Sequence, residues 1–252
     1  MDKIEKGFII NSFHGAVSVY ADATKKIGLW QSEKYAFEKY LNREDAILDI
    51  GCGTGRTTFA LYKKGFQNLT GIDLTPAMLY EAEKIAHEYN LDIPFILGDA
   101  TDLPFNDSSF DKSIFAFNGL MQIPQRKNRT LALKEINRIL KPEGLFIFTT
   151  HDRDKNENYL NFWEQEEMIW CVGKQDERLY EFGDIFTSGK TLQEDTYLHI
   201  PTKLEVLECL EEARFKVIES FYRSELFHEN EDVNDFTSDC RFWIVQKSGS
   251  AF

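Results

Sequence analysis

The sequence predicts an α/β fold with a doubly wound, mostly parallel sheet and an antiparallel hairpin at one edge. Two observations lead to this prediction. From about residue 46 to 150, short apolar runs alternate with amphipathic helical patterns, as in a parallel sheet covered by helices on both faces. After residue 150 the alternation stops, and two later apolar runs can pair as the hairpin. We expect one domain over residues 1–252.

The first half of the chain carries the clearest elements. Helices are expected over 32–41, 54–64 and 76–89, and strands over 47–50, 69–73 and 95–98. Gly65 is a typical helix end, and Thr75 followed by Pro76 is a typical helix start. These elements alternate as the doubly wound arrangement requires, because parallel crossovers are right-handed almost without exception.

The second half is less regular. Strands are expected over 113–117 and 145–150, and a helical stripe from residue 132 to 140 is broken by the KPEG sequence at 141–144. Thr202 and Glu205 form a capping-box pattern that opens a helix to about residue 214. Strands over 217–222 and 242–246 would form the edge hairpin. Residues 155–200 are an insertion rich in acids and aromatics.

Composition limits the classes of function. No apolar run approaches the roughly 18 residues that span a bilayer, and the N-terminus lacks the features of a secretory signal, so a cytoplasmic protein without membrane contact is expected. A net charge of −13 disfavours nucleic-acid partners. The four cysteines form no CxxC pair and no zinc-like cluster, so we expect reduced thiols and no metal. Nothing in the sequence indicates the oligomeric state.

The stretch ILDIGCGTG, residues 47–55, places three glycines directly after a buried strand. Glycines there let the backbone turn tightly and approach a ligand at the carboxyl end of the strand. The free N–H groups of the next helix face the same crevice. A nicotinamide or flavin site would need glycine where Arg56 stands, so that class of oxidoreductase is disfavoured.

Two acids strengthen the prediction of a nucleotide-like ligand. Asp73 ends the second strand, where a carboxylate can accept hydrogen bonds from both ribose hydroxyls, and Asp99 follows the third, beside an adenine amino group. Each acid alone is equally consistent with a turn at a strand end. Their occurrence after successive strands, behind the glycine triplet, favours the binding function.

Five ordered motifs carry a resemblance to a known family. They are ILDIGCGTG (47–55), GIDLTPAML (71–79), GDATDLPF (98–105), FDKSIFAFNGL (110–120) and RILKPEGLFIF (138–148). Together they resemble class I S-adenosylmethionine-dependent methyltransferases, and most closely the branch that methylates small molecules. The resemblance is strong over residues 35–152 and returns at 199–217. It implies methyl transfer from S-adenosylmethionine to a small molecule by in-line displacement.

The resemblance also implies roles for single residues. The residues expected to bind S-adenosylmethionine are Asp49, Gly51, Cys52, Gly53, Gly55, Asp73, Leu74, Met78, Asp99, Ala100, Asn118 and Gly119. Asp49 would orient the amino group, Asp73 would hold the ribose hydroxyls, and Asp99 would read the adenine edge. Gln122 stands where relatives often carry histidine, so a base is missing at that position.

Residues for the acceptor are less constrained. His151, after the fifth strand, is the best candidate for a general base, although its surroundings favour an ordinary histidine in a polar loop over that role. Tyr20, Trp30, Gln122, Trp163 and Trp170 are candidate acceptor contacts. The two tryptophans lie in 155–200, which would form a lid that excludes water, or else a small core with an acidic exterior.

Two alternatives remain open from the sequence. One is a protein that binds the cofactor without catalysis, which intact motifs cannot distinguish from an enzyme. The other is a nucleic-acid methyltransferase; an amino-directed DNA enzyme would show an Asp/Asn-Pro-Pro-aromatic motif where this chain has Asn118 to Met121. Neither the methyl acceptor nor the accepting atom can be derived from the sequence.

Overall fold

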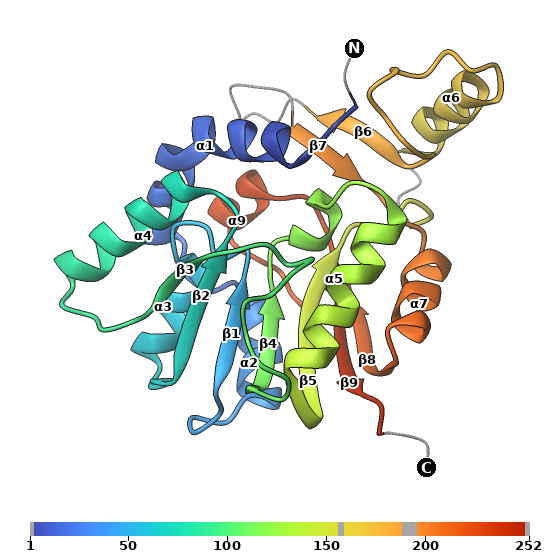
Figure 1. The fold of residues 1–252 in the computed structure, drawn as a ribbon. Coiled ribbons are helices and arrows are strands. Elements are labelled where there is room, and N and C mark those ends of the chain that lie inside the picture. Colours follow the sequence, from blue (N-terminus) through green and yellow to red (C-terminus); the bar gives the residue numbers. More distant parts are fainter. Residues whose placement is uncertain (1–2, 156–158, 188–195, 250–252) are drawn as a thin grey trace.

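The computed structural model describes residues 3–155, 159–187 and 196–249 of the chain. Its centre is a seven-stranded sheet in the order β3-β2-β1-β4-β5-β9-β8 (Figure 1). The parallel strands are β1 (Ile47–Ile50), β2 (Leu69–Asp73), β3 (Phe95–Leu97), β4 (Phe110–Phe115) and β5 (Leu140–Thr150). The antiparallel strands β8 (Phe215–Tyr222) and β9 (Arg241–Lys247) complete the sheet. The predicted fold class is therefore confirmed, including the edge hairpin.

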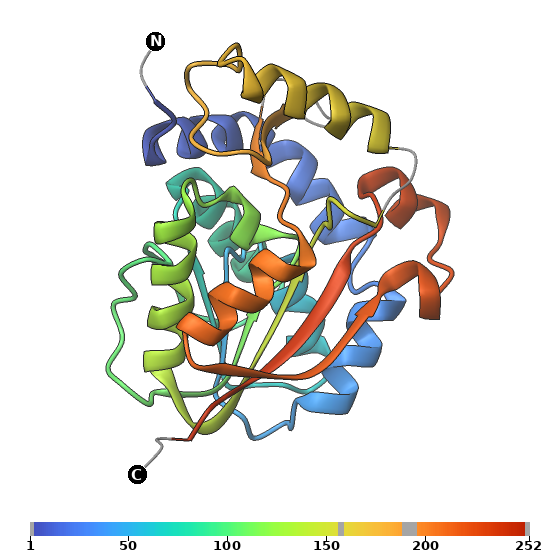
Figure 2. The same cartoon turned by 90° about the vertical axis from the view of Figure 1, so that its right-hand side faces the viewer.

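Helices cover both faces of the sheet (Figures 1 and 2). One face carries α1 (Lys6–Lys26), α2 (Gln31–Tyr40), α3 (Arg56–Lys63) and α4 (Pro76–Glu88), and the other carries α5 (Arg126–Ile139) and α7 (Lys203–Glu212). Strand alternation divides the core between the faces: Phe146 and Phe148 pack with α5 and α7, whereas Ile147 packs on the opposite side. This double layer buries both faces of the parallel strands.

The remaining elements lie around this core. They are the 3-10 turn η1 (Gly119–Gln122), helix α6 (Leu160–Cys171), the hairpin β6 (Asp184–Thr187) and β7 (Thr196–His199), and the short helices α8 (Arg223–Leu226) and α9 (Glu231–Phe236). The β6–β7 hairpin forms a separate small sheet beside α1, above the carboxyl ends of the parallel strands (Figure 1). Part of the predicted insertion, 156–158 and 188–195, lies outside the described residues.

Several predicted boundaries need correction. The strand expected over 113–117 runs from Phe110 to Phe115, because Phe117 and Asn118 adopt left-handed φ values of 53° and 60° that end the strand. The KPEG sequence does not interrupt the chain before the fifth strand; β5 already begins at Leu140. No helix in the described part of the chain is long and apolar enough to cross a membrane. The cytoplasmic location stays a prediction.

Candidate active site

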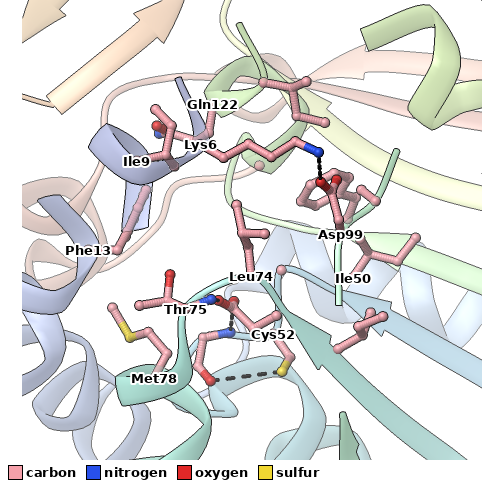
Figure 3. Close-up of a pocket in the computed structure, with 18 of the residues that line it drawn as sticks. Lys6, Ile9, Phe13, Ile50, Cys52, Leu74, Thr75, Met78, Asp99 and Gln122 are labelled. Carbon is pink, nitrogen blue, oxygen red and sulfur yellow. Dashed lines mark hydrogen bonds and ion pairs between the residues drawn. The ribbon is translucent and has the colours of Figure 1, made fainter. Parts of the chain in front are cut away.

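A cavity of about 490 Å³ lies at the carboxyl ends of the parallel strands. Ten of the residues predicted to bind the cofactor line it: Asp49, Gly51, Cys52, Gly53, Asp73, Leu74, Met78, Asp99, Ala100 and Gly119. Figure 3 shows Cys52, Leu74, Met78 and Asp99 around the space, with Lys6 and Ile9 of α1 across it. The sheet topology thus brings together side chains from the ends of β1, β2 and β3.

The glycine loop explains why glycines follow the stiff strand β1. Gly51, Gly53 and Gly55 have φ values of 60°, 55° and 88°, in the left-handed region that disfavours other residues. A Cβ atom on Gly51 would lie 2.6 Å from the ring of Phe115. Gly55 caps α3 and does not line the cavity; its role is to let the chain turn beside Phe59.

Asp73 holds the glycine loop against the start of α4. One carboxylate oxygen accepts a hydrogen bond from the backbone N–H of Gly53, and the other from that of Thr75, each at 2.8 Å. Burial raises the pKa of Asp73 despite these hydrogen bonds. Asp73 lines the cavity, so its carboxylate can also accept hydrogen bonds from ligand hydroxyls. The side chain therefore fits the ribose role predicted for it.

Asp49 lies deeper in the same wall. It is buried and accepts a hydrogen bond of 2.6 Å from the hydroxyl of Thr58. Burial raises its pKa to about 7, against the lowering effects of Thr58 and the Arg56 charge. The Arg56 guanidinium itself is paired with Glu33 at 2.6 Å. Because Arg56 is already neutralised, Asp49 remains available for a cationic ligand group.

Asp99 is engaged by the N-terminal helix. Its side chain accepts hydrogen bonds of 2.8 Å from the backbone and the hydroxyl of Thr101, and it forms an ion pair with Lys6 of α1 (Figure 3). Burial would raise the pKa of Asp99, but Lys6 and Thr101 lower it overall. The predicted adenine-reading carboxylate therefore already has a cationic partner.

Helix α1 forms the roof of the cavity. Lys6, Ile9, Phe13 and Tyr20 all line it, and the ring of Tyr20 contacts that of Phe13 with 5.8 Å between centroids. Burial and the Asp73 charge raise the pKa of Tyr20, which therefore stays a neutral phenol. Lys6, Ile9 and Phe13 are not among the site residues expected from the sequence. Their signal was present, because positions 6, 13 and 20 repeat every seven residues and so share one face of a helix.

Trp30 lies behind this roof and does not line the cavity. It is 1% exposed, its ring contacts Phe117 with 5.7 Å between centroids, and the guanidinium of Arg56 lies 4.9 Å from its centroid. Phe117 does face the cavity. Trp30 therefore packs behind Phe117 and does not line the cavity, where it was expected to contact the acceptor.

His151 does not reach the cavity. Its Nδ1 lies 2.8 Å from the carbonyl oxygen of Asp239 and its Nε2 lies 3.3 Å from the amide nitrogen of Asn118. Since the carbonyl can only accept, Nδ1 carries the proton and the Nε2 lone pair accepts from Asn118. Burial lowers the pKa of His151, so the ring is neutral. The structure thus corrects its expected position: neither His151 nor its buried partner Asn118 faces the acceptor.

The predicted acceptor contacts from 155–200 are also placed elsewhere. Trp163 and Trp170 pack edge-on against Phe182, with 5.9 and 6.3 Å between ring centroids, and line no part of the cavity. Among the described residues of that segment, Tyr180 is the one that lines it. Gln122 also lines the cavity, and its buried Oε1 has no hydrogen-bond partner. The wall of the cavity therefore includes one polar side chain with an unused hydrogen-bond acceptor.

Comparison with known proteins agrees with this geometry. Residues 47–144 match the family model described as a methyltransferase domain. The chain is 35% identical over 181 residues to demethylmenaquinone methyltransferase of Staphylococcus aureus, covering 67% of this chain and 66% of that protein. It is 28% identical to the ubiquinone/menaquinone biosynthesis C-methyltransferase of Rickettsia felis, covering 87% of each. The chain spans 41% and 66% of the lengths of the first two curated relatives that it matches.

A solved structure shares the whole fold. An S-adenosylmethionine-dependent methyltransferase of Methanosarcina mazei superposes with a TM-score of 0.68 at 24% identity, covering 88% of this chain and 99% of that one. The chain belongs to the class I S-adenosylmethionine-dependent methyltransferases, a family that implies S-adenosylmethionine as the co-substrate. Its similarity is to members of that class that methylate small molecules.

Proposed function

We propose that this chain transfers the methyl group of S-adenosylmethionine to a ring carbon of a hydroxyl-bearing aromatic small molecule. The observation that carries the proposal is the composition of the cavity beyond the glycine loop. Phe13, Phe117, Ile123 and Pro124 line it together with Gln122, whose buried Oε1 has no hydrogen-bond partner. Apolar walls with one convergent polar group favour a flat, largely apolar ligand with a hydrogen-bond donor.

The cofactor site would be formed by the residues that fit it best. Gly53 has an open cradle, with Tyr20 at 3.9 Å as the neighbour nearest to an added Cβ. Asp73 can accept hydrogen bonds from ribose hydroxyls, and Asp49 would face the amino group. Bound S-adenosylmethionine would supply a methyl group already activated by its sulfonium charge.

The chain's own contribution is positioning. Helix α1 covers one side of the cavity, while Tyr180 and the 123–125 turn would hold the acceptor ring. Holding two reactants in a near-attack pose is worth up to about 7–11 kcal/mol. No histidine lines the cavity among the described residues, so the acceptor should be nucleophilic without a strong base. A hydrogen bond from a ring hydroxyl to Gln122 would enrich the ring in electrons.

Ring chemistry further limits the acceptor. An oxidised quinone ring is electron-poor and cannot displace the sulfide leaving group, whereas a hydroquinone can attack through a carbon beside its hydroxyl. The proton on that carbon is then lost to solvent as the ring recovers its aromaticity. The names of the similar Staphylococcus and Rickettsia proteins, a demethylmenaquinone methyltransferase and a C-methyltransferase, support this acceptor class.

A turnover assay tests the proposal. The protein is incubated without oxygen with S-adenosylmethionine and naphthohydroquinone, naphthoquinone or duplex DNA. We expect S-adenosylhomocysteine and a singly methylated ring product from naphthohydroquinone alone. Binding of S-adenosylhomocysteine without methylation of naphthohydroquinone would refute the acceptor class and favour a binding protein. Methylation of DNA would favour the nucleic-acid alternative.

A further inference from the structure

A buried cluster of charged side chains joins the β6–β7 hairpin to α5 and α7. At its centre His199, 1% exposed, lies between two carboxylates. Its Nδ1 is 2.7 Å from Oδ1 of Asp184, which is fully buried, and its Nε2 is 2.7 Å from Oε1 of Glu205. The cluster lies outside the cavity and belongs to no part of the site described above.

The protonation of this cluster follows from its hydrogen bonds. Burial alone would raise the pKa of Glu205, but His199 and Arg129 lower it to about 2. The pKa of Asp184 is lowered in the same way by His199 and Tyr197, against burial. Ionised carboxylates can only accept hydrogen bonds, so both nitrogens of His199 must donate. Both contacts of the ring are hydrogen bonds to ionised carboxylates at once only when each ring nitrogen carries a proton.

Neighbouring charges come from every element packed around the ring. Arg129 of α5, which is buried, contacts both Glu205 and Glu181 at 3.0 Å. Tyr197 of β7 donates to Asp184 at 2.7 Å. Arg153, which precedes α6, donates to the carbonyl oxygen of Ile200 at 3.0 Å. Without the charge on His199, three acids would face two arginines in a buried space, which is costly.

A metal ion fits this cluster less well. Glu181, Asp184 and His199 present ligand atoms within 4.8 Å of one another. Both nitrogens of His199 are already committed to hydrogen bonds, however, and the Arg129 guanidinium contacts Glu181. A divalent cation would have to displace a proton and approach a fixed positive charge. A proton on His199 would balance the charge of the carboxylates without bringing a divalent cation close to Arg129.

The cluster is connected to the acceptor side of the cavity. Asp184 Oδ2 accepts from the backbone N–H groups of Tyr180 and Glu181 at 2.9 and 3.1 Å. Glu181 in turn accepts from the backbone N–H of Arg126 at 2.7 Å, at the first turn of α5. Tyr180 lines the cavity, and so does the 123–125 turn that leads into α5. Two separate walls are thus tied to one buried histidine through the acids that contact it.

We propose that His199, as an imidazolium between Asp184 and Glu205, is a positioning residue that fixes Tyr180 and the 123–125 turn around the methyl acceptor. This inference rests on the proposed function for the identity of the acceptor side. His199 touches neither ligand, so it acts through the acids that flank it. Removing its charge should loosen the acceptor wall while leaving the glycine loop and Asp73 in place.

The protonation state is tested by NMR on protein with isotopically labelled histidine. The ring of His199 should carry protons on both nitrogens at neutral pH. That signal should vanish in His199→Gln and persist in His87→Gln, a matched control on the exposed face of α4. A singly protonated ring at position 199, or a shift of this signal on adding Zn²⁺, would overturn the proposal. The wild-type spectrum decides even if His199→Gln does not fold.

The positioning role is tested by kinetics with naphthohydroquinone. His199→Gln should raise its KM about ten-fold or more, the loss expected for one charge-assisted hydrogen bond. kcat and S-adenosylhomocysteine affinity should stay within about two-fold. Glu205→Gln, which keeps an acceptor of the same shape, should raise KM less than Glu205→Leu. Equal losses in cofactor affinity and acceptor KM would indicate general destabilisation and refute the positioning role.

Failure of the proposed function would be recognised separately. If the wild type binds S-adenosylhomocysteine but does not methylate naphthohydroquinone, the acceptor class is wrong. Amide hydrogen exchange then decides the positioning role. Faster exchange in His199→Gln over 123–128, with 47–56 unchanged, supports it; unchanged exchange in both stretches refutes it.

Discussion

Lys6, near the start of α1, forms an ion pair with Asp99 at the end of β3, across the cavity that the cofactor should occupy (Figure 3). The adenine amino group and the Lys6 ammonium are both donors, so they compete for one carboxylate. At the other end of α1 the hydroxyls of Thr24 and Thr54 lie 2.7 Å apart. Side-chain contacts therefore hold helix α1 at both ends, and cofactor entry should require the Lys6–Asp99 ion pair to break.

Lys6→Met should strengthen cofactor binding, because it removes the competitor for Asp99. A partly exposed ion pair is worth up to about 1 kcal/mol, so S-adenosylhomocysteine affinity should rise by about two- to five-fold. Calorimetric titration measures this. Lys127→Met, which changes an exposed lysine on α5, is the control and should have no effect. Weaker binding in Lys6→Met would show that Lys6 helps to hold the ligand.

Asp73→Asn should weaken S-adenosylhomocysteine binding by about ten- to a hundred-fold, the cost of about 1.5–3 kcal/mol for charge-assisted hydrogen bonds. The variant should also melt earlier, because the amide cannot accept from both Gly53 and Thr75 as the carboxylate does. Calorimetry and thermal melting measure the two effects. Asp92→Asn, at an exposed position, is the control. Unchanged affinity would remove Asp73 from the site.

Asp49 should make cofactor binding depend on pH. Its pKa is about 7 in the folded chain, above its ordinary value of 3.8. The carboxyl therefore binds a proton more tightly when folded, and its contribution to stability is complete below pH 3.8 and is lost as the pH rises through about 7. A cationic amino group prefers the ionised form, so affinity should fall by up to about ten-fold per unit as the pH drops below 7.

Calorimetry between pH 5.5 and 8 measures this dependence, roughly one unit to either side of the Asp49 pKa. Asp49→Asn cannot titrate, and its affinity should be lower and nearly independent of pH. Proton release on binding should appear in the wild type when buffers of different ionisation enthalpy are compared. A wild-type affinity that stays constant over this range would exclude Asp49 from contact with the amino group.

Tyr180→Ala should raise the KM for naphthohydroquinone more than Trp163→Ala or Trp170→Ala. Tyr180 lines the cavity, whereas both tryptophans contact Phe182 one layer away. S-adenosylhomocysteine affinity should stay nearly constant in all three variants. Steady-state kinetics and calorimetry make the comparison. The lid originally expected from the tryptophans would regain support if their replacement had the larger effect.

The glycine loop and the strand-end acids could be placed from the sequence because their signals are local. The boundaries of β1 and β2 agree with the predicted 47–50 and 69–73. A glycine at a turn or an acid at a strand end can be recognised from the apolar run that lies within a few residues of it. Parallel topology then brings the ends of β1, β2 and β3 to one edge, so Asp49, Asp73 and Asp99 meet without further information.

The acceptor side depended on contacts between distant parts of the chain. His151 was expected to face the crevice, but Asp239 and Asn118 hold it in the interior. Thr202 does cap α7 by accepting from the backbone of Glu205. The reciprocal half of the predicted capping box is replaced, since the side chain of Glu205 turns to His199 and Arg129. Neutralising buried charge outweighs one local cap.

The sequence by itself determined the order of the elements, the sheet and the positions of the glycine loop and the strand-end acids. Each of these follows from periodicity, glycine conformations and strand ends, which neighbouring residues decide. Only the tertiary structure decided that Lys6 forms an ion pair with Asp99, that Tyr180 lines the cavity and that His151 lies outside it. Those positions depend on packing and charge pairing between segments far apart in the chain, where the free energy of burying a group depends on partners that no local pattern records.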